Sequence, residues 1–310
     1  MAERRYVSTT RDGRSRTADG EVVLEVPPAA TPPATPAGAG LSGAPTPGEG
    51  PAVELRSLEG LLDDLGERIF VAEAGGAGPG DEAGAVVRVS GARLVGETRW
   101  DDARAARFAL ECTEHALEGS PDVALPHGRT LGGVLADVRT ALDRVERPSA
   151  ALGWLGRFAA LRRLRRDGAA VGDLAMLAAK EDEGAGIDLV DDPAWTRLAA
   201  AEEAVLACAE AVQYLAHPRW LSTREEREER AEVDAAPAEP RVEETPWGWV
   251  AIGSTRVPAH RSAARSAEQA AERCRQAAVD AGGAEAGAAE RAFQVALLAR
   301  LLGEGPAGET

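Results

Sequence analysis

The sequence predicts a mainly α protein, an alanine-rich bundle of about six to eight helices with minor β strands and hairpins and a disordered N-terminal tail. Several long segments place apolar residues three or four positions apart, which is the spacing of one helix face. Alanine is plentiful, whereas aromatic residues make up only 4% of the chain. Helices of this composition can pack closely through their small side chains.

Changes in composition divide the 310 residues into five parts. They are a disordered tail over residues 1–52, a small mixed segment over 53–97, a helical bundle over 98–233, a linker over 234–246, and a β-hairpin with two helices over 247–310. Much of the tail is rich in proline, glycine, alanine and threonine. Such a segment buries too little apolar surface to offset the entropy lost on ordering it.

The mixed segment is predicted to hold one short helix and three strands. Five leucines between Leu55 and Leu65 have the spacing of an amphipathic helix, with Gly66 near its end. Three runs rich in β-branched residues favour strands. These are residues 69–72, 86–89 and 93–95, of which the last two are predicted to form a hairpin around Ser90-Gly91-Ala92.

The best-formed helix signal of the chain lies between residue 101 and Gly119. Asp101 or Asp102 can accept the unpaired N–H groups of its first turn, and glycine ends a helix at low conformational cost. Charged residues occur at alternating steps of three and four, so they form one stripe, and small residues occupy the opposite face. The chain is predicted to pack around this helix.

Capping residues mark the helices that follow. Thr130 begins a helix that runs to residue 147, and Ser149 begins one that ends near Gly168. After a break, residues 169–181 continue helically. Asp192-Pro193 then opens a helix that runs to His217, and residues 222–233 form a charged, solvated helix. The C-terminal part is predicted to hold a hairpin with its turn at Gly253-Ser254. Two helices over 259–281 and 284–302, separated by Gly282-Gly283, are then expected to pack onto the bundle.

Phe108, Cys112 and His115 lie at the border between the charged face and the small-residue face of the 101–119 helix. We expect this strip to be a core edge with a hydrogen-bonded histidine. The alternative is a metal or small-ligand site, because Cys112 and His115 are one helical turn apart and bundles collect ligands from facing helices. However, no glutamate stands three residues before any histidine, so the Glu-x-x-His pattern of di-metal bundles is missing. The other histidines, all near predicted helix ends, are His127, His217 and His260.

Sequence motifs do not favour an enzyme. The chain lacks Gly-x-Ser-x-Gly, and a Cys112–His115 pair inside one helix leaves little room for an oxyanion hole. All three cysteines stand among alanines in helical patterns, which is typical of buried, reduced thiols in a cytoplasmic protein. We therefore expect no cofactor and a non-enzymatic role.

The charge distribution points to a protein partner. A net charge of −16 argues against binding nucleic acid or an anionic membrane, and the lack of an apolar run of about 18 residues argues against a membrane span. A local basic run on one predicted helix could bind an acidic partner, or it could match the acidic surface of the chain itself. This run consists of Arg157, Arg162, Arg163, Arg165 and Arg166. Trp247 and Trp249 of the predicted hairpin are further contact candidates, or they fasten the hairpin to the helices. The sequence leaves homo-oligomer formation open.

The stretch RFALECTEHAL, followed by a proline-flanked turn and TLGGVLADVRTAL, resembles a bacterial family of helical immunity proteins. Glu290-Arg291-Ala292-Phe293-Gln294 is similar to the closing motif of that family. The resemblance covers residues 100–145 and the last helix, whereas the tail, the strands at 86–95 and the hairpin depart from the family pattern. It implies a toxin-neutralising binding protein without enzymatic activity.

Overall fold

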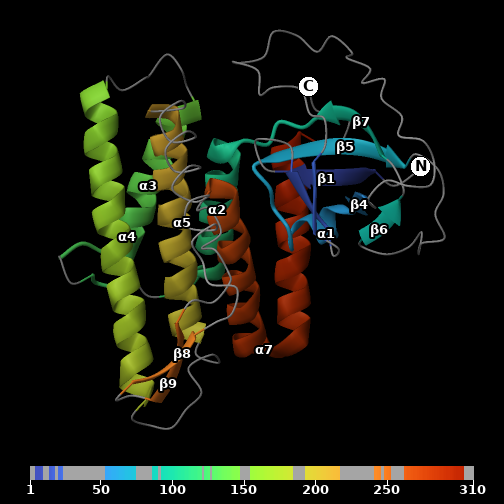
Figure 1. The fold of residues 1–310 in the computed structure, drawn as a ribbon. Coiled ribbons are helices and arrows are strands. Elements are labelled where there is room, and N and C mark those ends of the chain that lie inside the picture. Colours follow the sequence, from blue (N-terminus) through green and yellow to red (C-terminus); the bar gives the residue numbers. More distant parts are fainter. Residues whose placement is uncertain are drawn as a thin grey trace.

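A computed structural model describes residues 4–9, 14–17, 20–23, 53–74, 86–89, 92–120, 122–125, 128–146, 154–183, 193–216, 241–245, 248–252 and 262–303. Helices predominate among these residues, as predicted, and they lie beside a five-stranded antiparallel sheet (Figure 1). The helices are α1 (Leu58–Leu61), α2 (Asp102–Ala116), α3 (Leu131–Glu146), α4 (Trp154–Glu183), α5 (Pro193–Ala216) and α7 (Ala263–Leu302). No described helix is long and apolar enough to span a bilayer.

The sheet has the strand order β6-β4-β1-β5-β7. Its strands are β1 (Arg5–Thr9), β4 (Val53–Arg56), β5 (Arg68–Ala74), β6 (Val86–Val89) and β7 (Ala92–Glu97). Two further hairpins, β2 (Arg14–Thr17) with β3 (Gly20–Val23) and β8 (Arg241–Thr245) with β9 (Gly248–Ile252), complete the strands of the described residues.

The central strand β1 comes from the segment expected to be a disordered tail. It pairs antiparallel with β4 on one side and β5 on the other, and both Tyr6 and Val7 are buried. Tyr6 faces the helices and Val7 faces the opposite side of the sheet, so both faces of the strand bury apolar surface. Residues 5–9, together with the paired strands β2 and β3 over 14–17 and 20–23, therefore contradict the disordered tail predicted over 1–52, while residues 24–52 lie outside the described residues.

The predicted hairpin of β6 and β7 is wrong, although both strands exist. β6 pairs with β4 and β7 pairs with β5, so they occupy opposite edges of the sheet. Four strand spacings would separate the edges of a flat sheet by about 19 Å, but the three residue steps from Val89 to Ala92 span at most about 11 Å. The sheet must therefore curl strongly. A small apolar cluster, made by Val7, Val53, Leu55, Ala72 and Val89, packs on one of its faces.

The predicted leucine helix is divided between two elements. Leu55 lies in β4, and α1 is a single turn whose N-cap, Ser57, accepts a hydrogen bond from the Gly60 N–H at 3.2 Å. Leu55 is in a strand rather than in the predicted helix because β4 pairs with both β1 and β6. A larger cluster joins this region to the helices through Tyr6, Leu61, Leu62, Leu65, Ile69 and Trp100.

Helix α2 packs against α3, α5 and α7, but the centre of the helical layer is α5, which packs against α2, α3, α4 and α7. The prediction that the chain packs around α2 is therefore wrong in this respect. Asp101 is its N-cap, because its carboxylate accepts the Arg104 N–H at 2.8 Å. The charged stripe is not simply solvated, since it pairs with neighbouring helices. The pairs are Arg107 with Asp143, Glu114 with Arg139, and Glu111 with Arg300.

One predicted helix end and one predicted hairpin turn differ in the structure, whereas the predicted break at Gly282-Gly283 is confirmed. Helix α4 continues through Gly168, where the absence of a side chain brings it close to Val205 of α5. The two C-terminal helices are both present in α7, which folds back on itself at Gly283 with φ 75° and ψ −170° (Figure 1). In the β8–β9 hairpin Thr245 pairs with Gly248, so the strands are joined by residues 246–247 rather than at Gly253-Ser254, and β8 lies within the predicted linker.

Candidate functional site

The exposed side of α4 carries the arginines that the sequence singled out. Over residues 159–175 the buried positions fall on one face, which packs against α5 and α3. The opposite face exposes four guanidinium groups within five residues, belonging to Arg162, Arg163, Arg165 and Arg166. The structure thus brings these four together on one surface, which we call the arginine face. Arg157 also lies in α4, but its side chain is outside the described set.

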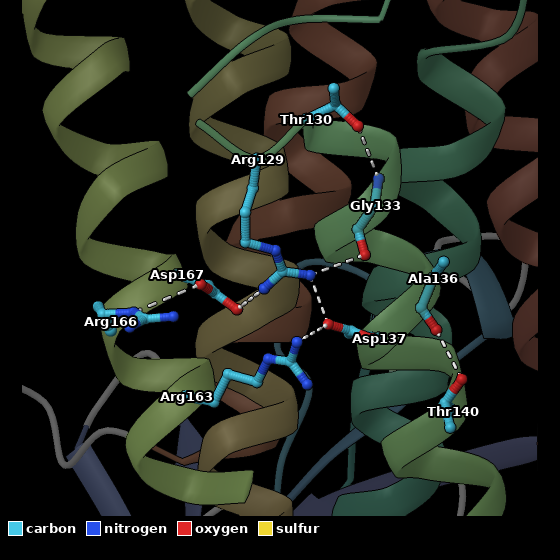
Figure 2. A network of polar contacts seen from close by, with 9 residues as sticks. All are labelled: Arg129, Thr130, Gly133, Ala136, Asp137, Thr140, Arg163, Arg166 and Asp167. Carbon is cyan, nitrogen blue, oxygen red and sulfur yellow. Dashed lines mark hydrogen bonds and ion pairs between the residues drawn. The ribbon is translucent and has the colours of Figure 1, made fainter. Parts of the chain in front are cut away.

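Part of the arginine face is matched by the chain's own carboxylates, which was the alternative interpretation. Arg163 Nη2 lies 3.3 Å from Asp137 Oδ2 of α3, and Arg166 Nε lies 4.0 Å from Asp167 Oδ1 (Figure 2). Arg163 and Arg166 nevertheless remain 55% and 68% exposed. Exposed ion pairs of this length contribute little stability, so the groups remain accessible to another anion.

Arg129 connects the carboxylates beneath the arginine face. From the turn before α3 it donates through Nη1 to Asp167 Oδ2 at 2.5 Å, and through Nη2 to Asp137 and to the Gly133 carbonyl at 3.1 Å (Figure 2). Burial opposes the charge of Arg129, but the bonds to Asp137 and Asp167 outweigh burial and raise its pKa. The Asp167 side chain is only 1% exposed, and Arg129, whose side chain is 21% exposed, supplies a counter-charge to it at 2.5 Å.

Neither Arg129 nor Asp167 was recognised from the sequence. Arg129 precedes the predicted cap Thr130, whose hydroxyl does accept the Gly133 N–H at 3.2 Å, but nothing local indicates its partners. Asp167 offered a signal, because it stands at a buried position three residues after Leu164 on the apolar face of α4. A charged residue at such a position requires a buried partner.

Three arginines and two aspartates form the network of Figure 2, and Arg162 and Arg165 extend it along α4. Arg162 has no ion-pair partner among the residues that the structure describes. Arg165 has an interaction of its own outside this network. The arginines of the cluster still outnumber its two aspartates, on a protein whose net charge is −16. Guanidinium groups bind carboxylate and phosphate oxygens through paired N–H donors.

His115 lies in the last turn of α2 and contacts the second arm of α7. Its Nδ1 is 2.7 Å from Glu290 Oε2, and its ring stacks on Phe293 with centroids 3.9 Å apart and planes 11° from parallel. Gln294 donates to Glu290 Oε1 at 2.9 Å and to the Ala271 carbonyl at 2.8 Å. His115 is 40% exposed while Glu290 is buried, which is the hydrogen-bonded histidine expected at a core edge.

Cys112 is buried one turn before His115 and faces the interior. Burial raises the pKa of its thiol well above the usual value, with nearby Cys274, Glu290 and Glu111 adding to the effect. A protonated, buried thiol is a poor metal ligand. Within the described parts of the chain, no group of three or more His, Cys, Asp or Glu side chains could hold a metal ion. His127, His217 and His260 lie outside those parts.

The hairpin tryptophans are only partly placed. The backbone of Trp249 pairs with Glu244 in the β8–β9 hairpin, but its side chain is outside the described set, as is all of Trp247. No family model, curated protein or solved structure matches this chain. The chemistry of the arginine face and of His115 is therefore the basis for any functional interpretation.

Proposed function

We propose that this chain is a non-enzymatic protein-binding protein whose arginine face on α4 binds an acidic surface of a partner protein. The observation that carries the proposal is the exposure of Arg162, Arg163, Arg165 and Arg166 on one face of a helix whose other face is packed. In Figure 1, α4 lies on the far side of the helical layer from the sheet. Arginine is also among the residues most favoured in protein interfaces.

The charge contrast between α4 and the remaining chain supports a specific orientation of the partner. An acidic partner is repelled by a chain of net charge −16 except where positive charge is concentrated. Attraction at the arginine face together with repulsion elsewhere selects one binding geometry and disfavours others. The same net charge disfavours nucleic acid and anionic lipid as ligands, because their extended negative charge would contact the acidic surroundings.

Buried thiols support a non-enzymatic role in a reducing compartment. Cys112, Cys208 and Cys274 are all free and buried, and burial raises the pKa of each thiol. Thiols held in the protonated form are weak nucleophiles, and unpaired cysteines are typical of cytoplasmic proteins. A concrete version of the proposal, suggested by the resemblance over residues 100–145 and the last helix, is inhibition of a toxin by an immunity protein.

The test is affinity capture from the native cell with charge-neutral variants. Arg162→Gln with Arg166→Gln removes two exposed charges from the arginine face, and we expect the captured partner to be lost or reduced about tenfold. Arg275→Gln with Arg300→Gln removes two charges from α7, one from a half-buried side chain and one from an exposed side chain, and serves as the control, with capture unchanged. Equal capture by both double variants would show that the arginine face does not bind the partner.

A ligand site at His115 is the second candidate. The observation that favours it is the buried carboxylate of Glu290 on Nδ1, because metal-binding histidines commonly carry such a partner on the second ring nitrogen. Elemental analysis of the purified chain separates the two proposals. A stoichiometric transition metal that is lost in His115→Ala would favour this alternative over protein binding alone.

A further inference from the structure

Asp137 and Asp167 both neutralise Arg129, but they differ in exposure. Asp137 is 35% exposed on α3 and accepts from Arg129 while it also pairs with Arg163 at 3.3 Å. Asp167 is buried and accepts from Arg129 at 2.5 Å. Figure 2 shows Asp137 between Arg129 and Arg163, at the border of the arginine face. Asp137 thus places a negative charge beside the surface proposed to attract one.

We infer that Asp137 is an internal competitor at the arginine face: it occupies Arg163 in the free protein, and a carboxylate of an acidic partner segment competes with it for that guanidinium. This inference rests on the proposed function. It assigns Asp137 a specificity-determining role, since only a partner with enough negative charge to overcome Asp137 would bind well. The partner class is a protein segment rich in glutamate or aspartate.

Displacement of Asp137 leaves no buried charge without a partner. Arg129 keeps its bond to Asp167 and its bond to the Gly133 carbonyl, so its half-buried guanidinium still has hydrogen-bond partners. Arg163 is 55% exposed, and its pair with Asp137 is longer than a normal hydrogen bond, so it can turn toward a partner at small cost. Asp167 could not be exchanged in this way because its side chain is buried.

Repulsion between Asp137 and the incoming carboxylate sets the size of the effect. Two carboxylates that contact one guanidinium lie about 5–6 Å apart, and at that separation near a solvated surface their repulsion weakens binding by about threefold to tenfold. Asp137→Asn removes the charge but keeps an oxygen that can accept from Arg129. We therefore expect this variant to fold normally and to bind acidic segments more tightly.

The experiment measures fluorescence anisotropy of a labelled polyglutamate peptide with the full chain at an ionic strength of about 0.15 M, where the Debye length is about 8 Å. Asp137→Asn is expected to tighten binding about threefold to tenfold, and the gain should disappear when Arg163→Gln is added. The control is Asp143→Asn, which removes the same charge from α3 where it pairs with Arg107. We expect this control to change binding less than about twofold, because that charge is screened over the greater distance.

Each outcome bears on one of the two proposals. If Asp137→Asn and Asp143→Asn bind alike while Arg162→Gln with Arg166→Gln weakens binding, Asp137 is not a competitor but the arginine face still binds acidic segments. If neither the wild-type chain nor Asp137→Asn binds polyglutamate, both proposals are overturned. If a single-stranded RNA of equal charge binds more tightly than the peptide, the assignment of an acidic protein segment is wrong.

Discussion

Truncation of Val7 tests the placement of β1 in the centre of the sheet. Val7 is fully buried and packs in the small cluster of the sheet with residues from β4, β5 and β6. Val7→Ala removes two methyl groups, each worth about 0.8 kcal/mol of transfer free energy, and it leaves a cavity. We expect the free energy of unfolding to fall by about 2–3 kcal/mol, which lowers Tm by about 5–10 °C.

Urea denaturation followed by circular dichroism measures this loss, and an unchanged slope against urea would show that the unfolded state is unaffected. Val95→Ala in β7 is the matched control, because Val95 is 52% exposed, and we expect a change within about 0.5 kcal/mol. Equal stability of the two variants would refute the central position of β1 and would favour the tail interpretation of residues 1–52. We also expect deletion of residues 1–9 to abolish the circular dichroism signal of the strands. If residues 1–52 were a tail, the deletion would leave that signal intact.

Three other perturbations probe local features. Gly283→Ala should lower the free energy of unfolding by about 1–3 kcal/mol because its backbone conformation is nearly restricted to glycine, while Gly96→Ala, at an open position in β7, should have a much smaller effect in the same thermal melts. Burial raises the pKa of Cys208 to about 12, so the native thiols should resist a thiol reagent until urea unfolds the chain. Rapid labelling of the native chain would contradict the burial of these thiols. Because burial raises the thiol pKa in the folded state, the free energy of unfolding should also decline as pH rises above about 9. The bond from the Gly132 N–H lowers the pKa of Asp122, so its contribution is present at neutral pH and lost as pH falls through the folded pKa. The stability difference between the wild-type chain and Asp122→Ala should therefore shrink in acid, and a constant difference from neutral to acidic pH would contradict the assignment.

Helix starts were predictable because their signals are local. Asp101, Thr130 and Pro193 stand where the chain enters α2, α3 and α5, and each acts within one turn of its own position. The stop predicted at Gly168 failed because glycine also allows close helix packing, and the choice depends on α5, which lies far away in the sequence. Local signals therefore specify where helices begin better than where they end.

The sheet was less predictable because its order depends on distant pairing. Residues 86–89 and 92–97 are strands, and their short connection favoured a hairpin between them. In the structure, however, β6 pairs with β4 and β7 pairs with β5. The functional surface shows the same division. A row of arginines is visible in the sequence, whereas the pairing of Arg129 with Asp137 and Asp167 requires three segments to meet.

The attachment of α7 to the segment around α1 bears on how the chain folds. Glu268 of α7 accepts the Leu65 N–H across a separation of 203 residues, and Arg291 of its second arm donates to the Glu59 carbonyl and to Asp63. Contacts so distant along the chain form slowly, because a long loop must close before they are gained. During synthesis the apolar side of the α1 segment would stay uncovered until α7 has left the ribosome, so a chaperone that shields this segment should raise the yield of folded protein.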